Sequence, residues 1–285
     1  MDILSTLKQL KNTTPNEAVL IEYILKHPEQ CLNLKPKEIA KAAYVSLATL
    51  YRLLEKIECA GVNEFKIELA IAISGEKTAP EQGIDVNYPI SSQDNFYQIM
   101  EGLDKTYQQT LEDTRSKVNA LVLRNVIDLL ADAPVIDLYT TSSNVYFAQN
   151  FAFQMQEIGR IVNVPTEEYI SNVTAANSDE NHVALMISYG GRRQGSKALI
   201  ELLQGNQTPI ILITSTQGNP LEAHATLTLY MSSDEDHYDK ISSFSSRLSL
   251  LYLLDLLYAN IVSTNFNDYI HYKKSHYQRI AKALG

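Results

Sequence analysis

The chain has 285 residues, a formal net charge of -9 at pH 7 and a 45% hydrophobic composition. At roughly 150 residues per domain, this length predicts two domains, each large enough to bury its own core. The two cysteines, Cys31 and Cys59, lie apart in apolar contexts, which excludes a disulfide framework and a cysteine-based zinc site. We expect two buried free thiols, no metal and no cofactor. No apolar run approaches the roughly 20 residues of a membrane span and no signal pattern opens the chain, so we expect a cytoplasmic protein.

Residues 37–56, KEIAKAAYVSLATLYRLLEK, have the pattern of two short helices joined by a tight turn. In Lys37–Ala43, small apolar residues recur at the spacing of one packed helix face. Ser46 is a good N-cap for a second helix with leucines on its buried side. Such a helix fits the DNA major groove, and the side chains expected to face DNA are Lys37, Ser46, Thr49, Tyr51, Arg52 and Lys56. An ordinary helical hairpin with a solvated polar face explains the same spacing equally well.

The location of the charge favours the DNA interpretation. Met1–Lys77 carries 10 basic and 10 acidic residues, so the whole net charge of -9 lies beyond it. Within residues 35–56, five basic residues stand against two acidic ones. A local basic excess suits a small DNA footprint, and the acidic remainder would repel DNA and favour one docking orientation.

A domain boundary is predicted where glycines and prolines gather among polar residues after Ile73, a composition typical of a linker. We therefore expect an all-α DNA-binding domain over 1–77, a linker over 78–90 and a second domain over 91–285. The second domain is expected to open with a helical stretch over residues 91–131, in which apolar residues recur in two helical stripes.

From Pro134 onward, short β-rich runs alternate with helical segments. The runs expected to form strands are Val135–Tyr139, Ile161–Val164, Val183–Ser188, Ile210–Thr214 and Leu227–Met231. The helices expected between them include Val145–Gly159 and Ser196–Gln204. This alternation predicts an α/β domain with a parallel sheet flanked by helices, and ligands are expected at the carboxyl ends of the strands.

Three of these strand ends carry polar loops. Residues 140–144, TTSSN, precede a helix, where hydroxyls and free backbone N–H groups form an anion site. Residues 188–195, SYGGRRQG, combine glycines that admit a ligand close to the backbone with arginines that can pair with phosphate. The third loop is TSTQGNP at 214–220. The ligand-binding residues predicted from these loops are Ser142, Ser143, Ser188, Gly190, Gly191, Arg192, Arg193 and Thr214. Ordinary helix capping explains each loop when it is taken alone.

In the order of its motifs, the chain resembles the RpiR/MurR family of bacterial transcription regulators, which join an N-terminal helix-turn-helix to a C-terminal sugar isomerase (SIS) domain. The resemblance covers nearly the whole chain. The segments that carry it are AYVSLATLYR (43–52), GVNEFKIEL (61–69), Ser142-Ser143, ISYGG (187–191), residues 213–221, FSSR (244–247) and DLLY (255–258).

The resemblance implies a multi-domain chain, with an all-α helix-turn-helix domain followed by an α/β SIS domain. It also implies roles for six residues: Ser46, Thr49 and Arg52 facing DNA, and Ser142, Ser143 and Ser188 holding a sugar phosphate. This chain departs from the family at Thr140 and Thr141, where the first loop normally has glycines, and at Gly190, where the second normally has another serine. We hypothesise that Arg192 and Arg193 compensate for the missing hydroxyl.

The implied function is that of a regulator whose SIS domain senses a phosphorylated sugar and modulates operator binding. Its expected partners are a double-stranded DNA operator, a small-molecule sugar phosphate and further copies of the chain in a homodimer or homotetramer, with no membrane involved.

Two other functions stay open. A phosphosugar isomerase would need an acid and a base, and the candidates by composition are Glu222, Glu235, His224 and His237. A regulator could also use its SIS domain for oligomerisation only. We expect no enzymatic activity, because a DNA-binding unit has no obvious use in a housekeeping isomerase.

Overall fold

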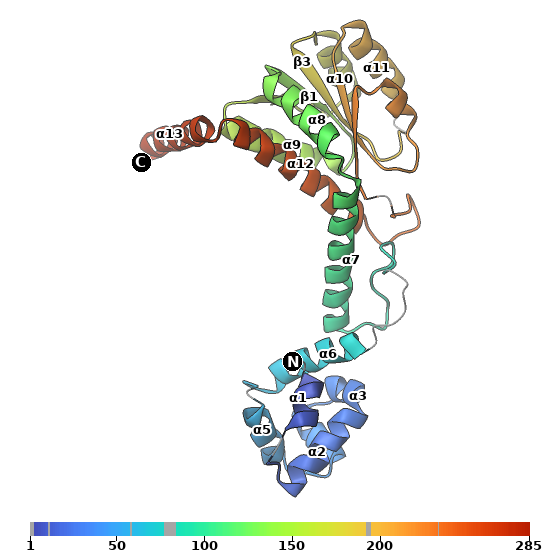
Figure 1. The fold of residues 1–285 in the computed structure, drawn as a ribbon, viewed down its shortest axis with the longest axis vertical. Helices are drawn as coiled ribbons and strands as arrows, with labels where there is room; N and C mark the ends of the chain where they lie inside the picture. The colour runs from blue at the N-terminus through green and yellow to red at the C-terminus, as the bar shows by residue number, and fades with distance from the viewer. Residues whose placement is uncertain (1–2, 11, 58, 77–83, 192–194, 233) are drawn as a thin grey trace. The chain divides into compact units, whose positions relative to one another are not determined.

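The computed structural model describes residues 3–10, 12–57, 59–76, 84–191, 195–232 and 234–285 (Figure 1). The chain divides into two compact units, residues 1–84 with 89–104 and residues 85–88 with 105–285, and each is considered by itself. The first part of the predicted linker, residues 78–83, lies outside the described residues.

The first unit is helical, as expected for a helix-turn-helix domain. Its elements are α1 (Ile3–Gln9), α2 (Pro15–Lys26), α3 (Pro28–Asn33), α4 (Pro36–Ala42), α5 (Leu47–Lys56) and α6 (Val62–Glu76). The helices pack around one apolar cluster, whose fully buried members include Leu20, Ile24, Ile39, Leu50, Leu53 and Phe65. The first turns of α7 (Phe96–Lys117) also belong to this unit.

The predicted pair of helices at 37–56 is confirmed by α4 and α5. Ser46 caps α5 as expected, since its Oγ accepts a hydrogen bond of 3.1 Å from the Thr49 amide. Pro36 occupies the first position of α4, where a missing N–H costs no hydrogen bond. Leucines at 50, 53 and 54 turn to the core, which leaves the opposite side of α5 exposed.

The helical stretch expected over 91–131 consists of two helices. α7 begins only at Phe96, and α8 (Ala120–Asp132) is a separate helix. The break comes at Asn119, whose Oδ1 accepts hydrogen bonds from the amides of Leu121 and Val122 and so starts a new helix. Apolar periodicity on both sides of the break concealed it, because asparagine interrupts a helix only where its side chain caps the next one.

The second unit contains a five-stranded sheet in the order β2-β1-β3-β4-β5, with every neighbouring pair parallel. The strands are β1 (Val135–Tyr139), β2 (Ile161–Asn163), β3 (His182–Ile187), β4 (Ile210–Thr214) and β5 (Leu227–Tyr230). All five strands predicted from the sequence are present, with ends that agree to within one residue. The chain order reverses between β1 and β3, and α/β proteins bind ligands in the crevice at the carboxyl side of such a reversal.

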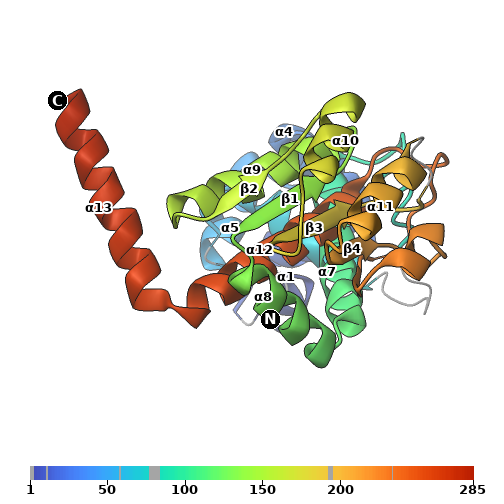
Figure 2. The same cartoon turned by 90° about the horizontal axis from the view of Figure 1, so that it is seen from above.

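Helices cover both faces of this sheet, as Figures 1 and 2 show. α8, α9 (Asn144–Glu157) and α12 (Phe244–Thr264) pack on one face, and α10 (Glu168–Ala176) and α11 (Ser196–Gly205) pack on the other. Alternation along β1 explains this arrangement, since Ile136 and Leu138 point to the first face and Tyr139 to the second. α10 was not among the helices predicted from the sequence.

The last helix, α13 (Phe266–Leu284), projects from the second unit (Figure 2). It meets α9 through Lys273, which donates to Glu157 over 2.7 Å, and none of its own residues is buried. No single described helix has the length and apolar composition of a membrane span; α12 and α13 pass that test only as a pair bent by 102°.

Candidate functional site

The exposed side of α5 carries part of the predicted DNA-facing set. Tyr51 and Arg52 are exposed on the helix, Ser46 is exposed at its start, and Lys37 is exposed on α4. These side chains are free to meet a duplex in the major groove, where the N-terminal part of a recognition helix reads base edges.

Two other predicted DNA-facing residues are engaged within the domain. Thr49 is only 7% exposed, and its hydroxyl lies 2.9 Å from the Ser46 hydroxyl. Lys56 donates to the carboxylate of Glu17 over 2.6 Å and to the carbonyl of Asn12 over 3.2 Å. Thr49 therefore orients the cap of α5, and Lys56 ties the end of α5 to α2.

The turn between α4 and α5 presents an aromatic residue that the sequence did not single out. Tyr44 is 95% exposed and its backbone has a φ of 53°, in the left-handed region. That conformation costs a non-glycine residue roughly 1–2 kcal/mol, and for a bulky side chain it is uncommon. The turn thus holds a strained, exposed ring directly before α5.

At the carboxyl edge of the sheet, the first predicted loop leads into α9. Ser142 is exposed with a φ of 56°, and Ser143 occupies the N-cap position of α9 without a side-chain capping bond in the described structure. Thr140, in contrast, is buried, and its hydroxyl donates to the Ile187 carbonyl over 3.2 Å. Ser142 and Ser143 are therefore presented at a helix N-terminus, while Thr140 joins β1 to β3.

The second loop folds back on itself. Ser188 is half-buried and its Oγ accepts a hydrogen bond of 3.1 Å from the Gly191 amide. Gly191 has a φ of 67°, and a Cβ there would lie 2.1 Å from Asn219 Oδ1, so only glycine fits. Gly190 lies between them, half-buried. The predicted Arg192 and Arg193 lie outside the described residues, and their roles stay predictions.

Thr214, in the third loop, is fully buried. Its hydroxyl donates to the Tyr189 carbonyl over 3.1 Å and accepts from Asn219 Nδ2 over 2.9 Å. Asn219 also donates to the Ser188 carbonyl over 2.9 Å. Thr214 and Asn219 thus link the second and third loops to each other, and Thr214 is not exposed to a ligand.

A hollow of about 160 Å³ opens at this edge of the sheet. Its walls come from the loops after β1, β3 and β5 and from the start of α12, and the lining residues are Ser143, Asn144, Tyr189, Met231, His237, Lys240, Ser243 and Ser246. Of the predicted ligand-binding residues that the structure describes, only Ser143 is among them. The hollow lies where a parallel sheet with this strand order binds ligands.

A buried carboxylate organises the wall formed by α12. Glu235 is 1% exposed and accepts hydrogen bonds from the amides of Ser245 and Ser246, at 2.6 and 3.1 Å, and from the Ser246 hydroxyl at 2.7 Å. Lys240 Nζ lies 3.1 Å from the same carboxylate and 6.0 Å from the centre of the Tyr189 ring. Burial raises the pKa of Tyr189 above its ordinary value, so its phenol stays neutral. Among the described residues, Lys240, which is paired with Glu235, and the N-terminus of α9 are positive elements of the hollow.

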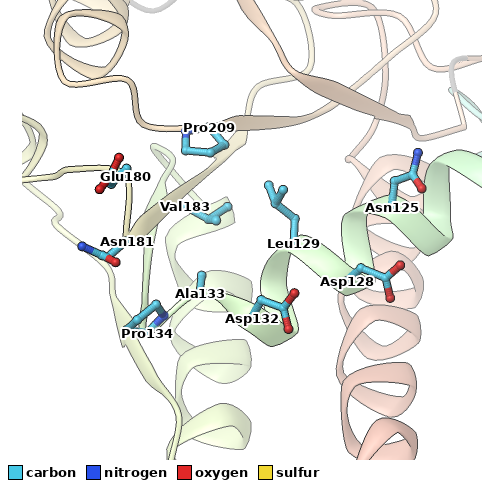
Figure 3. A pocket seen from close by; sticks show the side chains of 10 residues that line it. All are labelled: Asn125, Asp128, Leu129, Asp132, Ala133, Pro134, Glu180, Asn181, Val183 and Pro209. Carbon is cyan, nitrogen blue, oxygen red and sulfur yellow. The ribbon is translucent and has the colours of Figure 1, made fainter.

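Another hollow, of about 370 Å³, lies at the opposite edge of the sheet (Figure 3). It is formed where α8 ends and where β1, β3 and β4 begin, and Pro134, Val183 and Pro209 line it. Asp128, Asp132 and Glu180 also line it. Three carboxylates repel an anionic ligand, so a phosphate fits the hollow at the carboxyl edge far better.

Comparisons with known proteins agree with both halves of this structure. The helix-turn-helix domain of the rpiR family matches residues 1–76, and the SIS domain matches residues 129–259. An uncharacterised HTH-type transcriptional regulator from Caldanaerobacter subterraneus subsp. tengcongensis is 25% identical over 275 residues, covering 95% of this chain and 94% of the relative. The chain belongs to the RpiR family of transcriptional regulators.

Solved structures share the fold of this RpiR-family regulator. The NanR protein of Vibrio vulnificus, complexed with ManNAc-6P, has a TM-score of 0.60 and 17% identity, covering 98% of both chains. The sugar isomerase domain of an RpiR transcription factor from Sphaerobacter thermophilus has a TM-score of 0.57 and 14% identity, covering 64% of this chain and 99% of that domain. The second unit of this RpiR-family chain is therefore a SIS domain.

Several residues of the RpiR-family site escaped the sequence analysis. Lys240 and Ser243 were not considered, and Glu235 and His237 were weighed only as acid–base candidates. The FSSR segment at 244–247 was one usable signal, because it marks the start of the helix that Glu235 caps. The described residues before it, 231–232 and 234–243, form no helix or strand, and no periodicity reveals their place beside the sheet.

Proposed function

We propose that this RpiR-family regulator binds operator DNA through α5 and senses a sugar phosphate in the hollow at the carboxyl edge of its SIS sheet. On the DNA side, Ser46, Tyr51 and Arg52 contact the duplex from α5, with Lys37 contributing charge from α4. Arg52 suits guanine or phosphate, and the hydroxyls suit phosphates or base edges. Thr49 and Lys56 act indirectly by holding α5 in place.

One observation carries the sensing proposal. A lysine ammonium, a helix N-terminus and several hydroxyls converge on one hollow at the switch point of the sheet. In this proposal the phosphate lies at the start of α9, near Ser142 and Ser143, and Lys240 supplies its counter-charge. The hydroxyls of Ser243 and Ser246 face the sugar. Ser188 shapes the second loop, and Arg192 and Arg193 remain proposed phosphate ligands.

The same hollow argues for sensing over isomerisation. A sugar isomerase needs a carboxylate that can take a proton from the substrate. Glu235 is the carboxylate beside this hollow, and it is already engaged by two amides, one hydroxyl and Lys240. Glu222 lies in the third loop, where it accepts from the Asn219 amide and the Tyr230 hydroxyl. Both carboxylates are used for structure, so we propose a regulator without isomerase activity.

We further propose that copies of the chain pair through the SIS domain. α13 has exposed apolar side chains along its length, among them Phe266, Tyr277, Ile280 and Leu284, and none of its residues is buried. A helix with such a surface is stable chiefly when another surface covers it. A symmetric pair would set the spacing of two recognition helices on an operator with two half-sites. The division into 1–77, 78–90 and 91–285 is part of this proposal.

Calorimetry with a panel of hexose 6-phosphates, N-acetylhexosamine 6-phosphates and inorganic phosphate tests the sensing proposal. We expect one sugar phosphate to bind, and Lys240→Gln to weaken its binding by roughly tenfold or more, since one charge-assisted contact is worth about 1.5–3 kcal/mol. Lys197→Gln is the matched control, because Lys197 is exposed on α11. Fluorescence anisotropy with selected operator DNA should then change when the same sugar phosphate is added. Turnover of any panel member, or no binding at all, contradicts the proposal.

A further inference from the structure

Four residues within the predicted linker, 85–88, belong to the SIS unit. Residues 85–88 cluster with 105–285 rather than with the helical unit. Val86 is 3% exposed, and the Asn87 amide bonds to Asp85 Oδ1 over 2.9 Å, which closes a small turn. This segment, which we name the strap, is therefore seated on the SIS domain by its own burial and turn.

Within the part of the chain that the structure describes, the strap bonds to the loop between β5 and α12. Asn87 Oδ1 accepts from the Asp236 amide over 2.7 Å, and the Asn87 carbonyl accepts from the Ile241 amide over 3.0 Å. Asn87 Nδ2 lies 3.5 Å from the Asp234 carbonyl, and the Tyr88 hydroxyl bonds to Asp239. A single asparagine thus holds the loop near both of its ends.

The loop held by the strap also forms a wall of the proposed ligand site. His237 and Lys240 lie between the two amides that Asn87 engages, and both line the hollow. Asp236 reinforces this stretch from within, because its carboxylate accepts from the amides of Tyr238 and Asp239, each at 2.8 Å. These two amide bonds lower the pKa of Asp236, so it stays ionised at neutral pH.

We propose that Asn87 is a positioning residue of the ligand site, which sets the place of His237 and Lys240 through the loop. Binding of a sugar phosphate and seating of the strap are then coupled, and by linkage each favours the other to the same extent. Because the strap lies within the predicted linker, between residues 84 and 89 of the helical unit, this coupling carries the ligand signal toward the operator-binding helices. The identity of the ligand in this inference rests on the proposed function. The hydrogen bonds between the strap and the loop do not depend on that function.

Hydrogen exchange on the full chain, without any ligand, tests whether Asn87 holds the loop in place. Asn87→Ala removes the Oδ1 acceptor of the Asp236 amide and keeps the main-chain acceptor of the Ile241 amide. We expect the Asp236 amide to exchange at least tenfold faster than in the unaltered chain, and the Ile241 amide to exchange faster to a smaller extent, because the loop loses one of its two attachments. Asn181→Ala is the control, since Asn181 is exposed and its side chain bonds to Asp179, two residues away in the sequence. Unchanged exchange at both amides in Asn87→Ala overturns the positioning role.

The coupling is tested with the hexose 6-phosphate or N-acetylhexosamine 6-phosphate that binds best in calorimetry. We expect that ligand to slow exchange of the strap amides in the unaltered chain, and Asn87→Ala to weaken its binding by about tenfold while the midpoint of thermal unfolding stays within about 2 °C. If Asn87 had only a structural role, the ligand would not change the hydrogen-exchange rates of the strap amides. That result overturns the coupling. If no sugar phosphate binds the unaltered chain, the proposed function and the coupling both fail, and the exchange of the loop amides alone decides the positioning role.

Discussion

Lys56, in the last turn of the recognition helix, donates a 2.6 Å hydrogen bond to the buried carboxylate of Glu17 on α2. The same carboxylate closes a capping box with Thr14, whose amide donates to it over 2.8 Å. These bonds lower the pKa of Glu17, first because of the hydrogen bond from Lys56 and then because of the Thr14 amide. The placement of α5 therefore depends on an ionised side chain outside it.

We expect Glu17→Gln to reduce the free energy of unfolding at pH 7 by about 1–3 kcal/mol, because glutamine keeps the capping box and removes the charge. A carboxylate with a depressed pKa stabilises the fold above its unfolded pKa, and that contribution is lost as the pH falls through the folded value. The difference between variant and parent should therefore shrink below pH 4.5. Urea denaturation followed by circular dichroism measures it.

Glu22→Gln is the matched control on the same helix, since the pair that Glu22 forms with Lys26 is exposed at both partners. It should change the free energy of unfolding by less than about 0.5 kcal/mol. Equal effects of the two substitutions at pH 7 would show that the Lys56 pair does not anchor α5.

Tyr44→Gly should stabilise the helix-turn-helix domain by roughly 0.5–1 kcal/mol. Glycine adopts a φ of 53° without strain, and the greater freedom of its unfolded chain offsets only part of that gain. Thermal unfolding measures the change. Tyr44→Ala retains the strained backbone and should give no such gain in stability. A glycine variant less stable than the alanine variant would show that the backbone at residue 44 is not strained.

Arg52→Ala should weaken binding to operator DNA by roughly 5- to 150-fold, because one arginine contact to a base or phosphate is worth about 1–3 kcal/mol. Anisotropy titrations at several salt concentrations separate the two kinds of contact. A phosphate contact lowers the salt slope by about one, and a base contact relaxes the sequence preference. Lys26→Ala, an exposed basic residue on α2, is the control. Equal affinity for both variants would remove Arg52 from the interface.

Gly191→Ala should destabilise the SIS domain by roughly 1–3 kcal/mol, since alanine adopts the left-handed backbone poorly and its Cβ would collide with Asn219 and Pro220. Gly205→Ala is the reverse case, because nothing lies within 4 Å of the added Cβ at the end of α11, and it should be neutral or slightly stabilising. Calorimetric unfolding of both variants measures this difference in stability. Equal stabilities would show that the loop rearranges freely around the added Cβ.

Cys31 and Cys59 are buried free thiols, as the sequence predicted. Burial raises the pKa of Cys31 to about 11, so roughly one thiol in a thousand is ionised at pH 8. In a Cys59→Ser variant, Ellman's reagent should therefore label Cys31 at a rate limited by unfolding, and at once in 6 M guanidinium. Complete labelling of the native chain within seconds would contradict its burial.

Local chemistry determined much of this fold. The five strands follow from short β-branched and apolar runs bounded by turn residues, and α5 follows from a serine cap and leucines at helical spacing. Both signals lie within a few residues of each other along the chain. Where a local signal was ambiguous, the sequence did not locate the boundary, as at Asn119, where apolar stripes continue on both sides of a helix break.

The sequence by itself therefore determined the helical part, the α/β part and the order of their elements, and it indicated the sheet edge at which we propose that a ligand binds, because each depends on periodicity and capping. Only the tertiary structure decided which side chains meet there. Ser143, Tyr189 and Lys240 converge because parallel pairing brings β1 and β3 together and the loop before α12 crosses beside them. The same packing buries Thr214, since whether a loop hydroxyl faces a ligand or a neighbouring loop depends on contacts between residues distant in sequence.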